Sequence, residues 1–279
     1  MGYFKGWYFK CCTNKNTIAF IPAYHRANGR TTASLQIITD SSAINLPLDS
    51  LKYRSNPLYI SAEGCTFSES GIKLDITACG HSIRGVLSFG ETSPIKYDIM
   101  GPFGLVPFMQ CRHSIHSMSH RIDGHLTIDG HSFIFHNGTG YIEGDCGRSF
   151  PKQYIWTQSC FKNGSLMLSV ADIPMVGRHF TGIIGIIKLG SKEYRIATYL
   201  GADLKYISDG CVTVRQGDYM LTAKLIDKNA KPLYAPSNGR MSRTIHESAS
   251  CKAYYRFLHK GKPLCEFTSD RASFEFEYK

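Results

Sequence analysis

The stretch IDGHLTIDGHSFIFHN, residues 122–137, decides the fold class. Apolar and polar residues alternate on both sides of Asp129-Gly130, a dipeptide that accepts the positive φ angles of a two-residue turn. A hairpin about this turn pairs Leu126 with Phe133 and puts both side chains on one largely apolar face. The stretch therefore predicts an antiparallel hairpin with one buried face and one polar face.

Short alternating segments and glycine-bearing turns continue along the chain. An Asp-Gly turn recurs at residues 209–210, and the closing segment alternates Phe274 and Phe276 with Glu275, which we expect on a solvated face. Long helical stripes with caps at both ends are missing from the sequence. Further strands are predicted over residues 5–11, 16–22, 32–38, 71–78, 82–88, 154–161, 166–172, 180–188, 193–199, 219–227, 252–258 and 263–268. We therefore expect an all-β chain of antiparallel strands with little helix.

The chain is long enough for two domains. Its 279 residues are roughly twice a modal domain length of about 100–150 residues, and 43% hydrophobic against 19% charged residues argues against disorder. Trp7 and Trp156, its two tryptophans, each fall in the first predicted strand of one half. Glycines and a proline interrupt the strand pattern near residues 143–153. We expect two tandem β-barrels, residues 1–147 and 148–279.

The charge pattern and the cysteine spacing limit which partners the protein can bind and in which cell compartment we expect it. The net charge is +10, but no four basic residues are consecutive, so we expect no nucleic-acid partner and leave peripheral contact with an anionic membrane open. The ten cysteines form no C-x2-C pair, and the chain opens without a signal-peptide pattern. These features predict a soluble, cytoplasmic protein in which most cysteines are small buried hydrophobes.

One apolar segment is broken by turn residues. Gly101–Met109 contains two prolines and two glycines, which exclude a central strand. We expect this segment to cover a barrel mouth or the contact between the halves, with membrane contact as the alternative.

The segment Gly140–Gln158 gathers the residues with the most chemistry. If its strand continues, alternation puts Glu143 and Asp145 on the same side. Mutual repulsion would then keep one carboxyl protonated and make it a proton donor at neutral pH. An ion pair of Asp145 with Arg148 that stabilises the turn between the halves is the alternative.

This segment resembles the signature of the tocopherol cyclase family, whose plant members carry Glu, Asn-Trp-Gly, a Phe-Pro-basic step and a Trp-x-Gln strand in this order. The matching residues are Glu143, Gly147, Phe150, Pro151, Lys152, Trp156 and Gln158. The similarity extends over residues 140–279 and is vaguer before them. Cys146 stands where the plant enzymes have Trp, and Asp145 and Arg148 replace Asn and Gly. The resemblance implies a lipocalin-like protein of two barrels, and Gly6-Trp7-Tyr8 is similar to the opening of lipocalins.

The resemblance also implies a reaction, in which the phenolic oxygen of a prenylated hydroquinone closes onto an alkene, an isomerase (intramolecular lyase) activity. Ring closure of this kind needs an acid for the alkene, a dry pocket for the cation and a base for the phenol proton. Asp145 or Glu143 is the expected acid, and Arg148 or Gln158 is expected to hold the ring oxygen. The expected ligand-lining aromatic residues are Tyr154, Trp156, Phe150 and Trp7. No cofactor is expected.

Two other functions stay open. The barrels could carry an apolar isoprenoid or quinol-like molecule unchanged, or the protein could add water to an isoprenoid double bond, as carotenoid hydratases with paired lipocalin-like barrels do. An enzyme requires a buried carboxyl beside an enclosed apolar cavity, whereas a carrier requires only the cavity. The sequence leaves the ligand and the oligomeric state undetermined.

Six of the 11 histidines fall within residues 113–136. The hairpin register sends His131 to the apolar face and His125 and His136 to the other, so only subsets of them converge. We therefore expect an exposed polar sheet face and no metal site. A histidine pair oriented by Asp123 is the alternative.

Overall fold

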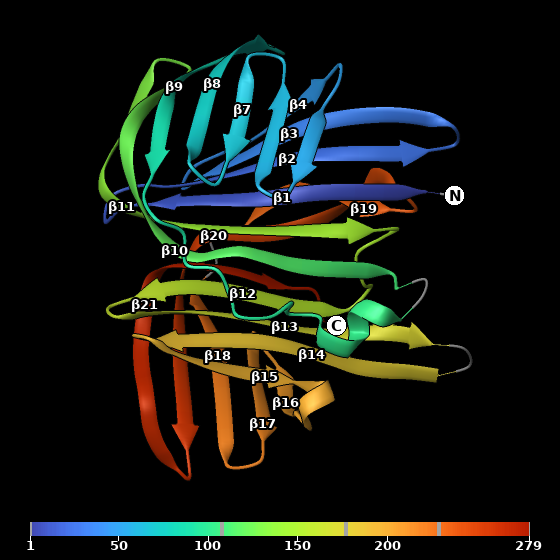
Figure 1. Ribbon diagram of the computed structural model, residues 1–279, viewed down its shortest axis with the longest axis vertical. Coiled ribbons are helices and arrows are strands. Elements are labelled where there is room, and N and C mark those ends of the chain that lie inside the picture. Colours follow the sequence, from blue (N-terminus) through green and yellow to red (C-terminus); the bar gives the residue numbers. More distant parts are fainter. Residues whose placement is uncertain (1, 107–108, 176–177, 228–229, 279) are drawn as a thin grey trace. The chain divides into compact units, whose positions relative to one another are not determined.

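The computed structural model describes residues 2–106, 109–175, 178–227 and 230–278, and nearly all of its regular structure is antiparallel strand (Figure 1). The chain divides into two compact units. The first comprises residues 1–96, 113–149 and 235–243, and the second comprises residues 97–112, 150–234 and 244–279. The predicted domains are continuous in sequence, whereas each unit takes in one segment from the other half of the chain.

The first unit is built on an 11-stranded sheet with the order β4-β3-β2-β1-β11-β10-β9-β8-β7-β6-β5. Its strands are β1 (Tyr3–Cys12), β2 (Thr17–Ala27), β3 (Arg30–Thr39), β4 (Ala43–Leu48), β5 (Lys52–Ser55), β6 (Leu58–Ala62), β7 (Cys65–Ser68), β8 (Gly71–Ala78), β9 (His81–Phe89), β10 (Cys111–Ile128) and β11 (His131–Gly147). All neighbours are consecutive in sequence except β1 and β11, which pair with Trp7 opposite Gly144. The first and last strands of the sheet therefore meet at its centre.

A single cluster of buried apolar side chains covers the inner face of this sheet. Phe9 on the central strand β1, Leu46 on the edge strand β4 and Ile60 on β6 all belong to it. Neighbouring strands lie about 4.8 Å apart, so a flat sheet could not bring these strands to one cluster. The sheet is therefore curled around its core, as in a barrel.

The second unit is built on a 10-stranded sheet with the order β15-β14-β13-β12-β21-β20-β18-β17-β16, and β19 also pairs with β20. Its strands are β12 (Tyr154–Phe161), β13 (Gly164–Met175), β14 (Arg178–Leu189), β15 (Lys192–Ala197), β16 (Asp203–Ser208), β17 (Cys211–Gln216), β18 (Tyr219–Asp227), β19 (Lys231–Ser237), β20 (Arg240–His259) and β21 (Lys262–Phe276). Ile196 on β15 packs in the same core cluster as Leu204 on β16. This sheet is curled as well, because β15 and β16 are its two edges.

The predicted all-β class with little helix is confirmed. Two short 3-10 helices, η1 (Gly101–Leu105) and η2 (Thr198–Leu200), are the helical elements of the described residues. Both Asp-Gly turns are confirmed, with positive φ angles at Asp129 (51°) and Gly130 (81°) and again at residues 209–210. Leu126 on the predicted apolar face is fully buried in the core.

The prediction for the cysteines is wrong for most of them. All ten are free thiols, but only Cys11, Cys65 and Cys251 are buried, while Cys79 is exposed and the others are intermediate. Burial raises the pKa of the Cys65 thiol to about 11, so this thiol is protonated at neutral pH.

The broken apolar segment begins with η1 over residues Gly101–Leu105. In the second unit, Phe103 packs against Phe180 and Tyr199, with ring centroids 5.6 and 5.4 Å apart, whereas Leu105 is 87% exposed. Residues 107–108 of this predicted cover lie outside the described residues. Within the part of the chain that the structure describes, every helix falls short of the length and apolarity of a membrane span.

We expect Phe67→Ala to destabilise the first unit by about 3–5 kcal/mol, because the variant leaves a cavity in a packed core. Phe67 is fully buried, with ring centroids 5.5 Å from Phe9 and 6.2 Å from Phe20. Urea unfolding in a Trp156→Phe background measures this loss, because Trp7 is then the sole tryptophan and reports the first unit. The exposed Val86→Ala variant is the control, and an equal loss in both variants would contradict the packing.

Candidate functional site

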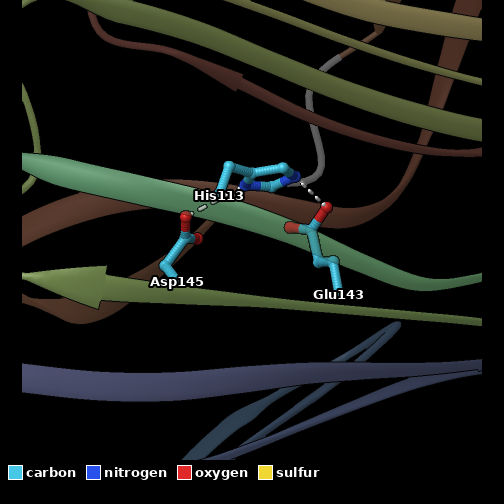
Figure 2. A group of neighbouring side chains, drawn as sticks. All are labelled: His113, Glu143 and Asp145. Carbon is cyan, nitrogen blue, oxygen red and sulfur yellow. Dashed lines mark hydrogen bonds and ion pairs between the residues drawn. The ribbon is translucent and has the colours of Figure 1, made fainter. Parts of the chain in front are cut away.

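Three ionisable side chains of the first unit converge on one face of its sheet (Figure 2). The ring of His113, on β10, lies between the carboxylates of Glu143 and Asp145, both on β11. Its Nδ1 is 2.9 Å from Oδ1 of Asp145, and its Nε2 is 2.9 Å from Oε2 of Glu143. The hydroxyl of Tyr141 also donates a hydrogen bond to Glu143. The result is a carboxylate–imidazole–carboxylate group with a phenol at one end.

Alternation along β11 places this group on the face that points away from the barrel core. Ile142 belongs to the core cluster, so Tyr141, Glu143 and Asp145 project to the opposite side. Gly144 faces inward, where a Cβ atom would lie only 3.0 Å from the ring of Trp7. The prediction that Glu143 and Asp145 share one side of a strand is confirmed.

The group is withdrawn from solvent, although it lies outside the barrel core. The side chains of His113 and Glu143 are 9% and 6% exposed, and that of Asp145 is 22% exposed. Burial alone would lower the pKa of His113, but the charges and hydrogen bonds of Glu143 and Asp145 outweigh burial and hold that pKa well above its ordinary value. His113 is therefore an imidazolium at neutral pH, and its positive charge lies between two acidic side chains.

The predicted repulsion between the two carboxylates is therefore relieved by a residue that the sequence reasoning had assigned elsewhere. His113 was expected on an exposed polar sheet face, and its burial corrects that expectation. The group also has the donor atoms for a divalent cation, since one ligand atom from each of the three residues lies within 4.8 Å of the others. Metal binding would require His113 to lose its proton and one of its carboxylate contacts. The arrangement is thus suited first to holding and moving protons.

Two other histidines of the run, His120 and His136, lie in different environments. His120 is buried, with its Nδ1 3.0 Å from Oγ of Ser117, and burial lowers its pKa to about 4. His136 is 82% exposed, with its Nδ1 3.5 Å from Asp123. Asp123 also pairs with Arg121. The predicted exposed face is thus correct for His136 and wrong for the buried histidines.

Two other predicted residues of the first unit are Trp7 and Arg148. Trp7 belongs to the barrel core and lies on the opposite face of the sheet from Glu143 and Asp145. The carbonyl of Arg148 accepts a hydrogen bond from the backbone N–H of Gly239 at 2.8 Å. The role of the Arg148 side chain therefore stays a prediction.

The other predicted ligand-lining residues lie in the second unit. Tyr154, Trp156 and Gln158 alternate with Ile155 of the core cluster, so they project away from that core, and all three are buried. The ring of Phe150 meets that of Tyr154 edge-on at 6.0 Å.

The second unit also holds a buried carboxylate that the sequence reasoning missed. The Tyr154 hydroxyl donates a hydrogen bond to Glu275, which is 7% exposed and not on a solvated face as predicted. Glu247, also buried, lies directly opposite Glu275 on the neighbouring strand. No local signal could have found this pair, because it depends on the register of β20 against β21.

Comparison with known proteins supports the fold. No protein-family model matches the chain, and no curated protein matches it. Among solved structures, CghA with Sch210972 aligns over 99% of this chain and 89% of its own length, with TM-score 0.65 and 10% identity. An AttH-like protein from Nitrosomonas europaea aligns over 100% of this chain and 93% of its own, with TM-score 0.58 and 8% identity.

These neighbours are lipocalin-like proteins, and the chain shares their fold. At such low identities the likeness carries the architecture alone, so the lipocalin-like part of the expected resemblance is confirmed. Membership in the tocopherol cyclase family stays a prediction.

We expect His113 to remain protonated, and His25 and His120 to remain neutral, between pH 5.5 and pH 7.5. Burial lowers the pKa of His25 to about 4, as it does for His120, whereas the carboxylates hold that of His113 high. Nitrogen-15 NMR of the imidazole rings distinguishes the two charge states. Single His→Gln variants assign the resonances, and a His113 signal that becomes neutral below pH 7 would contradict the ion-paired geometry.

Proposed function

We propose that this chain binds an apolar, unsaturated small molecule that carries a hydroxyl group and closes that hydroxyl onto an alkene. The observation that carries the proposal is the buried His113 ring held on both nitrogens by Glu143 and Asp145. Such a group can accept a proton at one end and deliver a proton at the other. A prenylated hydroquinone is the substrate class that the sequence resemblance implies.

The proposed step needs no co-reactant, because the product is an isomer of the substrate. Asp145, the more exposed carboxylate, accepts the hydroxyl proton, and His113 passes its own proton to Glu143. Glu143 protonates the alkene, and the hydroxyl oxygen forms the new C–O bond at the more substituted carbon. Tyr141 holds Glu143 in place through its hydrogen bond. Afterwards Asp145, which is partly exposed, releases its proton to water, and Nε2 of His113 takes up a proton again, so the group returns to its starting state.

The largely buried position of Glu143 and Asp145 favours their proposed role in proton transfer. A carboxyl and an imidazolium exchange protons more readily where water does not compete for them, and a tertiary cation survives longer in a dry site. Aromatic side chains stabilise such a cation through their ring faces. The ligand contacts expected from the sequence at Tyr154, Trp156 and Phe150, and at Gln158 and Arg148 for the ligand oxygen, stay predictions.

We expect Glu143→Gln and Asp145→Asn each to lower the rate of chromanol formation from a prenylated hydroquinone by roughly 10²–10⁴-fold, the usual share of a positioned acid or base. Both changes keep the shape of the side chain and remove its capacity to exchange a proton. Liquid chromatography with mass spectrometry follows the reaction, because the product has the mass of the substrate but a different retention time.

The control is Asp75→Asn, which breaks an exposed ion pair with Arg84 and should leave the rate unchanged. A product heavier than the substrate by one water molecule would show that the protein hydrates the alkene and does not close a ring. Tight binding of the hydroquinone without any product would show that the protein is a carrier of this molecule and not an enzyme that converts it. Undiminished turnover in both carboxylate variants would exclude them from the chemistry.

We also expect the wild-type protein to retain an apolar small molecule through purification, because the proposed function requires such a ligand beside the buried His113 ring. Organic extraction of the native protein followed by mass spectrometry identifies the molecule. An extract that matches that of an unrelated protein purified in the same way would count against the proposal.

A further inference from the structure

A row of small residues lies on the outward face of the first sheet. It begins beside the group of His113, Glu143 and Asp145, called the His113 group below, and runs across the neighbouring strands. Strand pairing places Asp145 opposite Gly6, Gly6 opposite Ala23, and Ala23 opposite Ser34. Directly paired residues project to the same face, and this is the face opposite to the core residues Trp7, Phe20 and Leu35. The two middle positions of the row therefore offer almost no side chain.

A side-chain carbon added at Gly6 would meet no clash. A Cβ atom built on Gly6 would meet only the Cβ of Ala23 at 3.5 Å and the carbonyl oxygen of Pro22 at 3.9 Å, and no other heavy atom within 4 Å. Phe4 and Tyr8 flank Gly6 on the same face of β1, and both are buried. The row thus has a bare floor between two aromatic side chains.

The far end of the row holds a second polar pair with an unsatisfied atom. Nε2 of His25 is 3.0 Å from Oγ of Ser34, and both residues are at least nine-tenths buried. Nδ1 of His25 is buried without a hydrogen-bond partner among the described residues. A buried polar atom without a partner is destabilising, so a ligand atom that satisfied Nδ1 of His25 would be favoured there.

We infer that the row formed by Gly6 and Ala23 is the floor of a binding slot for an elongated apolar molecule with a hydroxyl group at each end. One hydroxyl is held at the His113–Asp145 end and the other by His25 and Ser34. The inference rests on the proposed function for the first hydroxyl and adds the second hydroxyl and the length of the ligand.

The chemistry of the far end favours a hydroxyl over a charged group. Burial lowers the pKa of His25 to about 4, so the ring is neutral at pH 7. Depending on the tautomer, Nδ1 then donates or accepts one hydrogen bond, and a hydroxyl can serve in either case. Three interstrand spacings of about 4.8 Å separate Asp145 from Ser34 by roughly 14 Å. With a hydrogen bond of about 2.8 Å at each end, the two ligand oxygens lie on the order of 10 Å apart.

Equilibrium dialysis of the full chain with 4,4′-dihydroxybiphenyl, an elongated probe with two terminal hydroxyls, tests the slot. We expect it to bind about tenfold more tightly than 4-phenylphenol, which lacks one hydroxyl, because a lost buried hydrogen bond costs about that much. His25→Phe should reduce the affinity for the diol to that for the mono-alcohol. Gly6→Leu should abolish binding of both probes by filling the space above the floor.

Gly6→Ala provides a smaller change whose Cβ meets only ordinary contacts, and it should weaken binding without affecting folding. Ala43→Leu, at an exposed position of the edge strand β4, should bind both probes like the wild type, and circular dichroism checks that each variant is folded. Failure of the wild type to bind the diol, or unchanged binding in Gly6→Leu, would overturn the slot. Glu143→Gln separates this inference from the proposed function, because loss of the proton-transfer role removes turnover and leaves the His25 end intact.

Discussion

The structure of the first unit depends on the register of β11 against β1. Ile142 faces the core and Glu143 faces away from it, with Trp7 paired to Gly144 on the inner side. Because side chains alternate with period two, a slip of one residue would bring Glu143 and Asp145 into the apolar cluster and expel Ile142. A buried carboxylate without a partner is costly, so the core and the polar group fix the same register.

The group of His113, Glu143 and Asp145 is stable only when all three side chains are present. Glu143 and Asp145 lie close to each other and are largely withdrawn from water, which is unfavourable for acidic side chains without a partner. His113 removes this conflict because its two nitrogens face the two carboxylates at equal distances of 2.9 Å. Removing one member of such a group is more harmful than replacing the whole group with apolar residues, since it leaves a buried charge unpaired. A sheet that needed only stability would have no reason to keep all three.

Much of this fold follows from local sequence, and most of the site does not. The turn at Asp129-Gly130 and the alternation through Leu126 are short-range signals, so the hairpin could be predicted. The strands within residues 43–68 were missed, because each has only four to six residues and the alternation is too brief to stand out.

The site depends on contacts between distant strands. The common side of Glu143 and Asp145 follows from alternation alone, but the contact with His113 requires knowing how β10 lies against β11 thirty residues away. Glu275 alternates with apolar residues like any exposed strand residue, and only tertiary burial distinguishes it. The two tryptophans illustrate the same limit: both lie in the first strand of their sheet, yet Trp7 belongs to a barrel core and Trp156 faces away from one. Position along a strand is readable from sequence, whereas the face that becomes buried depends on what the strand pairs with.

The small residues on the outward face strengthen the case that this face serves a ligand. Glycine within a strand weakens the strand, because it loses more backbone entropy on folding and contributes no packing area. Gly6 is not forced by the backbone, since its φ lies outside the left-handed region and an added Cβ would meet no clash. A larger residue would therefore stabilise the sheet, and the absence of one beside two buried histidines with polar partners is better explained by a requirement for space. The same face combines a proton-holding group, two positions almost without side chains and an unsatisfied imidazole nitrogen, and a bound molecule with hydroxyls at both ends accounts for all three.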